Sequence, residues 1–139
     1  MDKPRLDVYL FFPGTAKEAM EFYQKIFGGE LSLQTHGEAM GDKADPKLKD
    51  KLIHARLEGG DVNLMGGDDM GTIPKESARI SISLTGSDEA KMRKVFEELA
   101  AGGKIEQPLE KLFWGDLFGV LRDKYGISWM VDVLAEGAK

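Results

Sequence analysis

The feature that most constrains the fold is a pattern that the sequence repeats. Residues 8–31 run as an apolar strand, a turn, an amphipathic helix, a Gly-Gly pair and a second strand, and residues 82–105 follow the same order. Equivalent positions include Phe22 and Phe96, and the stretches 56–60 and 122–126. Each half must bury the apolar face of its own elements, so we expect two half-sheets that pack together and leave a cavity or cleft between them.

Length and composition are those of one globular domain. The chain has 139 residues, of which 42% are hydrophobic and 31% are charged. Its net charge of -5 and its lack of a basic stripe argue against a nucleic-acid partner. It contains no cysteine, which excludes disulfides and thiolate chemistry and fits a reducing cytoplasm. No segment resembles a signal peptide or a membrane span, so we expect a cytoplasmic protein with no membrane partner.

The first half is typical of a strand, a helix and three further strands. An alternating strand ends at Pro13-Gly14, and Thr15 and Glu18 have the spacing of a capping box for the helix that follows. Tyr9 and Phe11 of that strand are expected to pack on the helices. The next strands are expected at residues 30–35, 52–58 and 62–65.

Two polar segments allow two interpretations each. Residues 36–51 are rich in lysine and contain Gly and Pro, which is typical of a loop that serves either as a flap or as a plain surface excursion. Asp68 and Asp69 could share a cation or a proton, but a Gly-rich linker favours solvated turn residues.

The second half repeats the order of the first. Ser87 is the expected N-cap of its helix, and Pro108 is expected to interrupt the strand that starts at Lys104. Further strands are predicted at residues 80–84, 117–121 and 127–134, with a turn at 123–126. We therefore predict an α+β fold of two βαβββ modules in tandem within a single domain, residues 1–139. Module one is expected at about 5–66, the linker at about 67–78 and module two at about 79–134.

Three stretches carry a resemblance to a known family. YLFFPGTAKEAMEFYQKIFGGE at 9–30, LIHARLEGGD at 52–61 and FWGDLFGVLRDKYGISWMVDV at 113–133 resemble the PhnB-like branch of the vicinal oxygen chelate superfamily. That superfamily includes glyoxalase I, bleomycin-resistance proteins, fosfomycin-resistance enzymes and ring-cleaving dioxygenases. The resemblance covers nearly the whole chain and implies this fold, its cavity and a homodimer. Proteins of this branch are sometimes labelled demethylubiquinone methyltransferases, but nothing here resembles a cofactor-binding glycine motif after a strand.

The resemblance also implies where metal-using relatives place their ligands. They use the first and fourth strands of each module, typically with His, Gln or Glu. The corresponding positions here are Val8, Leu64 (or Asn63 if the register slips by one), Ser81 or Ile82, and Met130. None of these side chains is a good ligand for a divalent metal, so we expect no metal and no other cofactor.

His54 is the best candidate for a catalytic residue. It lies in the middle of a predicted strand, on the polar face with Arg56 and Glu58. An imidazole titrates near neutrality and can act as a general base or hydrogen-bond a ligand. The alternative is a partly buried histidine bonded to a backbone carbonyl or to Glu58.

Ligand contacts are predicted mainly in the last third of the chain. Trp114 lies where a loop overhangs the cavity in the superfamily, and it either contacts a ligand or anchors that loop on the core or a subunit interface. Alternation places Trp129 in the core and turns Met130 and Asp132 towards the cavity, although solvation usually explains an aspartate near a strand end. The predicted ligand-binding residues are Arg56, Trp114, Phe118, Met130 and Asp132.

The sequence favours a metal-independent small-molecule-binding protein of the glyoxalase/bleomycin-resistance type. Its ligand is expected to be small, aromatic or anionic, and held by stacking and by Arg56. The alternative is a lyase, isomerase or dioxygenase of the same superfamily that uses a divalent metal held by His54 and a carboxylate such as Glu58 or Asp132. A third possibility, a protein-interaction module, predicts a filled interior with no pocket.

Overall fold

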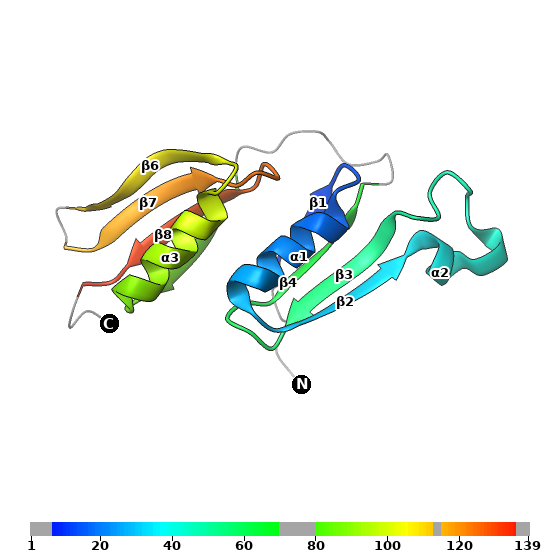
Figure 1. Ribbon diagram of the computed structural model, residues 1–139, viewed down its shortest axis with the longest axis horizontal. Coiled ribbons are helices and arrows are strands. Elements are labelled where there is room, and N and C mark those ends of the chain that lie inside the picture. Colours follow the sequence, from blue (N-terminus) through cyan, green and yellow to red (C-terminus); the bar gives the residue numbers. More distant parts are fainter. Residues whose placement is uncertain (1–6, 70–79, 113–114, 136–139) are drawn as a thin grey trace. The chain divides into compact units, whose positions relative to one another are not determined.

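The strand–helix–three-strand order occurs twice, as the sequence predicts. The computed structural model describes residues 7–69, 80–112 and 115–135, and its chain forms two compact units, Met1–Pro74 and Lys75–Lys139. Each unit contains a four-stranded mixed sheet with one long helix packed on it (Figure 1). The predicted α+β fold of two βαβββ modules is confirmed.

The first unit holds its four strands in the order β1-β4-β3-β2. Its elements are β1 (Tyr9–Phe12), α1 (Ala16–Phe27), β2 (Glu30–Thr35), β3 (Leu52–Glu58) and β4 (Leu64–Asp68). β1 pairs with β4 in parallel, and the other neighbours are antiparallel. Residues 36–51 are not wholly a loop, because the helix α2 (His36–Met40) and the short 3-10 helix η1 (Gly41–Lys43) lie within them. Thr35 and Glu38 form a capping box at the start of α2, a signal that the sequence reading missed.

The second unit has the same topology, with the strand order β5-β8-β7-β6. Its elements are β5 (Ile82–Gly86), α3 (Glu89–Ala100), β6 (Lys104–Lys111), β7 (Leu117–Arg122) and β8 (Ser128–Val133). β6 continues through Pro108, contrary to the prediction. The register of its pairing with β7 shifts between Gln107 and Glu110, and β6 is an edge strand, so the missing proline N–H breaks no regular ladder.

The core of the first unit lies between α1 and one face of the sheet. A Cβ built on Gly66 of β4 would lie 3.2 Å from the Met20 sulfur, which identifies this as the helix face. Leu10 and Phe12 are buried on β1, at 8% and 1% exposure, whereas Phe11 is 47% exposed. The prediction that Tyr9 and Phe11 pack on the helices is therefore wrong. Both faces of β1 are apolar in sequence, so alternation alone does not indicate which one faces α1.

The first turn of α1 is held by a residue distant in sequence. Thr15 makes no side-chain capping bond, so the predicted capping box is wrong. Instead, the buried carboxylate of Asp68 accepts hydrogen bonds from the Ala16 and Leu52 N–H groups, both at 2.9 Å. The description of Asp68 as a solvated turn residue is also wrong, because β4 runs two residues past the predicted end of module one and carries Asp68 to the helix.

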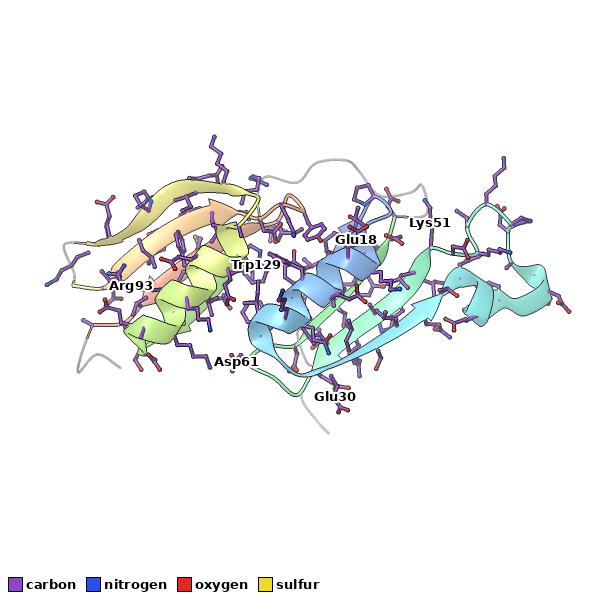
Figure 2. All side chains as sticks on the ribbon, viewed as in Figure 1. Glu18, Glu30, Lys51, Asp61, Arg93 and Trp129 are labelled. Carbon is purple, nitrogen blue, oxygen red and sulfur yellow. The ribbon has the colours of Figure 1, made fainter. Side chains whose placement is uncertain are left out.

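The second unit packs α3 on the corresponding face of its sheet. A Cβ on Gly119 of β7 would lie 2.8 Å from the Phe96 ring, and Trp129 of β8 is fully buried on the helix face, as predicted (Figure 2). Asp88, and not Ser87, caps α3, since its carboxylate accepts from the Lys91 N–H at 3.1 Å. Among the described residues, no helix is long and apolar enough to cross a membrane.

Candidate functional site

The face of the first sheet opposite α1 carries aromatic and basic side chains. A Cβ on Gly67 would lie 3.0 Å from the Tyr9 hydroxyl, so these two residues share this face, which we call the open face of the first sheet. His54 lies beside Tyr9, and Arg56 lies across from Met65 in the β3–β4 register. The sequence placed His54 and Arg56 correctly on one face but assigned Tyr9 to the other.

Tyr9 of β1 reaches across β4 and contacts β3 on this face. Its hydroxyl lies 3.3 Å from the Nδ1 atom of His54 and 3.3 Å from the carbonyl oxygen of Ile53. Its ring centroid lies 4.8 Å from that of Phe11 and 5.7 Å from that of His54. Burial raises the pKa of the Tyr9 phenol, so it remains a protonated hydrogen-bond donor at neutral pH.

Arg56 is a half-buried cation that no carboxylate neutralises among the residues the structure describes. Its one hydrogen bond there runs to the Met65 sulfur at 3.7 Å, and a thioether is a weak acceptor. Arg122, which holds the equivalent place in the sequence repeat, donates to the Gly126 carbonyl at 2.8 Å and lies 3.9 Å from the Glu106 carboxylate. The same residue type is therefore paired in one unit and available to an anion in the other.

The second sheet also has an open face, opposite α3. Phe118 pairs with Asp132, and Met130 is two residues before Asp132 on the same side of β8, so all three lie on the face away from Trp129. The predicted site residues thus form two groups, His54 and Arg56 on the first sheet, and Phe118, Met130 and Asp132 on the second. Trp114 lies outside the described residues.

Asp132 is less solvated than its place near a strand end suggests. Its Oδ1 atom is buried and has no hydrogen-bond partner among the described residues. Burial, and then the neighbouring carboxylate of Asp116, raise the pKa of Asp132. Asp116 is itself buried and accepts a hydrogen bond from the Ala135 N–H at 2.9 Å.

We expect Asp132→Asn to increase stability at neutral pH. Because the folded-state pKa is raised, proton binding by Asp132 favours folding below its ordinary pKa of 3.8, and this contribution disappears as the pH rises through the folded-state value. At pH 7 the charged group opposes folding, so its removal should add up to about 1 kcal/mol to the free energy of unfolding. Urea unfolding at about pH 7 and pH 3 measures this, and the gain should vanish at the lower pH. Asp42→Asn removes an exposed charge as the control, and an equal gain there would contradict the explanation.

The structure describes the positions that were expected to correspond to metal ligands. Leu64 is buried on the helix face, Asn63 precedes β4 and Val8 precedes β1, and the residue of β4 next to Leu64 on the open face is Met65. Ser81 pairs its hydroxyl with that of Ser128 at 2.9 Å, while Ile82 belongs to the helix face. Within the described ranges, no three His, Cys, Asp or Glu side chains are grouped closely enough to hold a metal ion.

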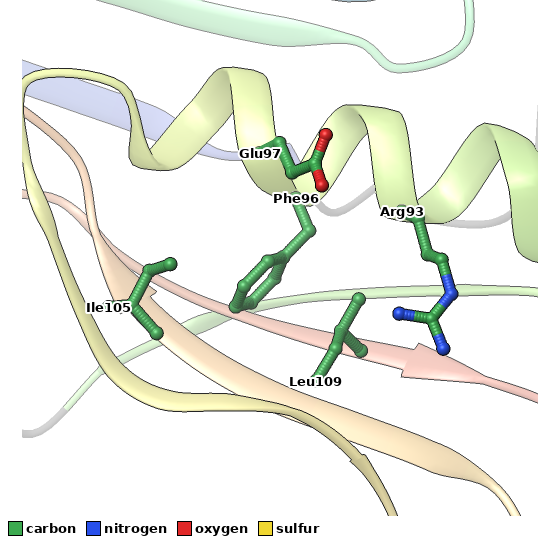
Figure 3. Close-up of a pocket in the computed structure, with 5 residues that line it drawn as sticks. All are labelled: Arg93, Phe96, Glu97, Ile105 and Leu109. Atoms are coloured by element: carbon green, nitrogen blue, oxygen red, sulfur yellow. The ribbon is translucent and has the colours of Figure 1, made fainter.

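A small hollow in the second unit lies elsewhere. It has a volume of about 160 Å³ and is formed between α3 and β6 (Figure 3). Its lining residues are Arg93, Phe96, Glu97, Ile105 and Leu109. This volume is below the roughly 300–1,000 Å³ of typical ligand pockets, and no predicted site residue contributes to it. The hollow is therefore not the candidate site.

Comparisons with known proteins identify one family and several solved structures with the same fold. The family model described as 3-demethylubiquinone-9 3-methyltransferase matches residues 4–132. The crystal structure of protein PA1353 from Pseudomonas aeruginosa is 33% identical, with a TM-score of 0.81 over 96% of this chain and 99% of its own. A putative 3-demethylubiquinone-9 3-methyltransferase, PhnB protein, from Bacillus cereus is 28% identical, with a TM-score of 0.76 over 94% and 100%. A glyoxalase-related enzyme from Fulvimarina pelagi shares the fold at 16% identity and a TM-score of 0.63, over 95% and 89%.

Proposed function

Because the chain belongs to the family described as 3-demethylubiquinone-9 3-methyltransferase, within the glyoxalase/bleomycin-resistance superfamily, we propose that it binds a small anionic molecule without a metal ion. The observation that carries this proposal is Arg56, a half-buried guanidinium that forms no ion pair with a carboxylate of the described residues. Charge-assisted hydrogen bonds to a carboxylate or phosphate would satisfy its donors far better than a thioether does. His54, two residues away on the same strand face, supplies a hydrogen-bonding or general-base group.

The geometry gives no support to methyl transfer from a nucleotide cofactor. Such a cofactor is usually held by a glycine-rich loop that presents the N-terminus of a helix. In this chain the first N–H of α1 is already bonded to Asp68, and Asp88 caps α3. The two long helices of the described residues thus direct their N-termini at the protein's own carboxylates.

The open face of the second sheet is a separate place for ligand contacts. There we propose apolar contacts from Phe118 and Met130 and a polar one from Asp132, and Trp114 stays a predicted stacking residue. Metal independence rests on the side chains at the ligand positions of the fold, since Met65 and Met130 offer thioethers that suit hard divalent cations poorly. We also expect a homodimer, which sedimentation would test. Stoichiometric Fe, Mn, Ni or Zn in protein purified without a chelator would overturn metal independence.

We expect Arg56→Gln to weaken anion binding roughly 10- to 100-fold, which corresponds to the loss of hydrogen bonds between charged partners. The measurement is a thermal-shift titration of the full chain with small carboxylates and phosphates, aromatic and aliphatic, because a ligand that binds only the folded state raises its stability. Arg122→Gln is the matched control. It removes the same charge from the equivalent position, where the guanidinium is already paired, and should leave the shifts intact.

Two results would contradict the proposal. One is that no anion of the panel stabilises the natural protein, and the other is that Arg56→Gln and Arg122→Gln behave alike. His54→Ala and Trp114→Ala test the remaining assignments, and if both left every shift unchanged the site would be wrongly placed.

A further inference from the structure

The Tyr9 hydroxyl contacts two groups but has only one proton to donate. The carbonyl oxygen of Ile53 and the Nδ1 atom of His54 each lie 3.3 Å from it. A carbonyl oxygen can only accept a hydrogen bond, whereas an imidazole nitrogen donates or accepts according to its tautomer. Both contacts are satisfied in one arrangement alone, in which Tyr9 donates to Ile53 and the Nδ1–H of His54 donates to Tyr9.

That arrangement determines the protonation state of Nε2, on the other edge of the His54 imidazole. When a neutral histidine carries its proton on Nδ1, Nε2 is a bare acceptor. No described residue forms a hydrogen bond with Nε2 of His54, so this lone pair is available to a ligand. Arg56 lies two residues along the same strand, roughly 7 Å away by strand geometry, and offers only donors.

We infer that Tyr9 is a positioning residue that holds His54 in the Nδ1–H tautomer, so that the site selects anions that also carry an O–H or N–H donor. The ligand class rests on the proposed function, since the anionic group is assigned to Arg56. The tautomer rests on the contacts of Tyr9 alone. A ligand of this class pairs its anionic group with Arg56. Its O–H or N–H group donates a hydrogen bond to Nε2 of His54, and the proton stays on the ligand.

Gly67 provides an independent observation for the same contact. A Cβ at this position would lie 3.0 Å from the Tyr9 hydroxyl and 3.1 Å from the Ile53 carbonyl oxygen. Such distances are tighter than most real Cβ contacts, so a methyl group here would force the Tyr9 hydroxyl or its partners to shift. Gly67→Ala therefore disturbs the hydrogen bonds of Tyr9 without removing its ring or its hydroxyl.

The tautomer is tested by the ¹⁵N chemical shifts of the imidazoles in the full chain, at about pH 8, where histidine is ordinarily neutral. We expect the shifts of His54 to report a protonated Nδ1 and a bare Nε2. Tyr9→Phe and Gly67→Ala should each produce a mixture of tautomers at His54. His36 is the internal control, because its Nε2 accepts from the Asp45 N–H at 3.3 Å, far from Tyr9 in the sequence, and should not change. A protonated Nε2 in the natural protein, or shifts of His54 that neither variant moves, would overturn the inference.

The ligand class is tested with two probes in which the same oxygen carries either a proton or a methyl group. We expect 4-hydroxyphenylacetate to bind about fivefold more tightly than 4-methoxyphenylacetate, the worth of one neutral hydrogen bond. In Tyr9→Phe the two probes should bind about equally, because the mixed tautomers of His54 no longer prefer a ligand that donates a hydrogen bond. Arg56 still binds the carboxylate of each probe. Equal binding of the two probes by the natural protein would overturn the ligand class. If neither probe bound, the ligand class would be contradicted, whereas the panel of anions would decide the proposed function and the nitrogen shifts the role of Tyr9.

Discussion

Replacement of Asp68 by alanine is expected to lower the free energy of unfolding by about 4 kcal/mol, because the change removes two buried hydrogen bonds to a charged acceptor. The carboxylate joins three elements, as it projects from β4, bonds the first N–H of α1 and bonds the N–H of Leu52 at the start of β3. Its negative charge also lies at the positive end of the α1 dipole. Without it, two N–H groups lose their acceptor in the interior of the first unit. Urea unfolding at pH 7 measures the loss.

Asp88→Ala is the matched control for this change. Asp88 also accepts from the N–H of a first helical turn, but it is exposed, so its loss should cost only about 1 kcal/mol. Asp68→Asn should give an intermediate loss, since an amide keeps one acceptor oxygen and turns N–H donors toward the other N–H group. If Asp68→Ala cost no more than Asp88→Ala, the carboxylate would not connect the three elements as described.

The repeat and the periodicity of the sequence predicted most of the fold. Apolar alternation and helical spacing located nearly every strand and both long helices, because these signals depend on neighbours in the chain. The hydrogen bonds of Asp68 could not be predicted from such local signals. Its partner Ala16 is 52 residues away, and only the pairing of β4 with β1 brings the two together. The spacing of Thr15 and Glu18 predicted a local cap for α1. In the structure Thr15 makes no capping bond, and the distant Asp68 bonds the first N–H of the helix instead.

The candidate site was predictable only in part. Alternation placed His54 and Arg56 on one strand face, and Met130 and Asp132 on another, because those strands mix polar and apolar residues clearly. It failed for Tyr9, whose strand is apolar on both sides. The difference between Arg56 and Arg122 is also invisible in the sequence, since the repeat equates them and only the neighbours of each guanidinium separate them.

Replacement of Asp123 by alanine should be at least as damaging as the loss of Asp68, with a cost of about 4–5 kcal/mol in the second unit. One oxygen of this buried carboxylate accepts from the N–H groups of Tyr125 and Ile127, at 2.9 and 3.0 Å. The other accepts from the indole N–H of Trp129 at 2.8 Å. The variant leaves that indole N–H buried without this acceptor and also releases the turn between β7 and β8. Because these strands carry Phe118 and Met130, we expect ligand binding in the second unit to weaken as well.

A double-mutant cycle separates the indole bond from the turn. Trp129→Phe removes the N–H that Asp123 accepts, so in that background Asp123→Ala should cost about 1–3 kcal/mol less than it does in the natural protein. The remaining cost includes the contribution of the two backbone hydrogen bonds, since Trp129→Phe leaves Tyr125 and Ile127 in place. Additive losses in the cycle would show that the carboxylate supports the turn alone. A coupling within the expected range would show that Asp123 both stabilises the turn of the hairpin and hydrogen-bonds the buried Trp129, because both roles require the same carboxylate.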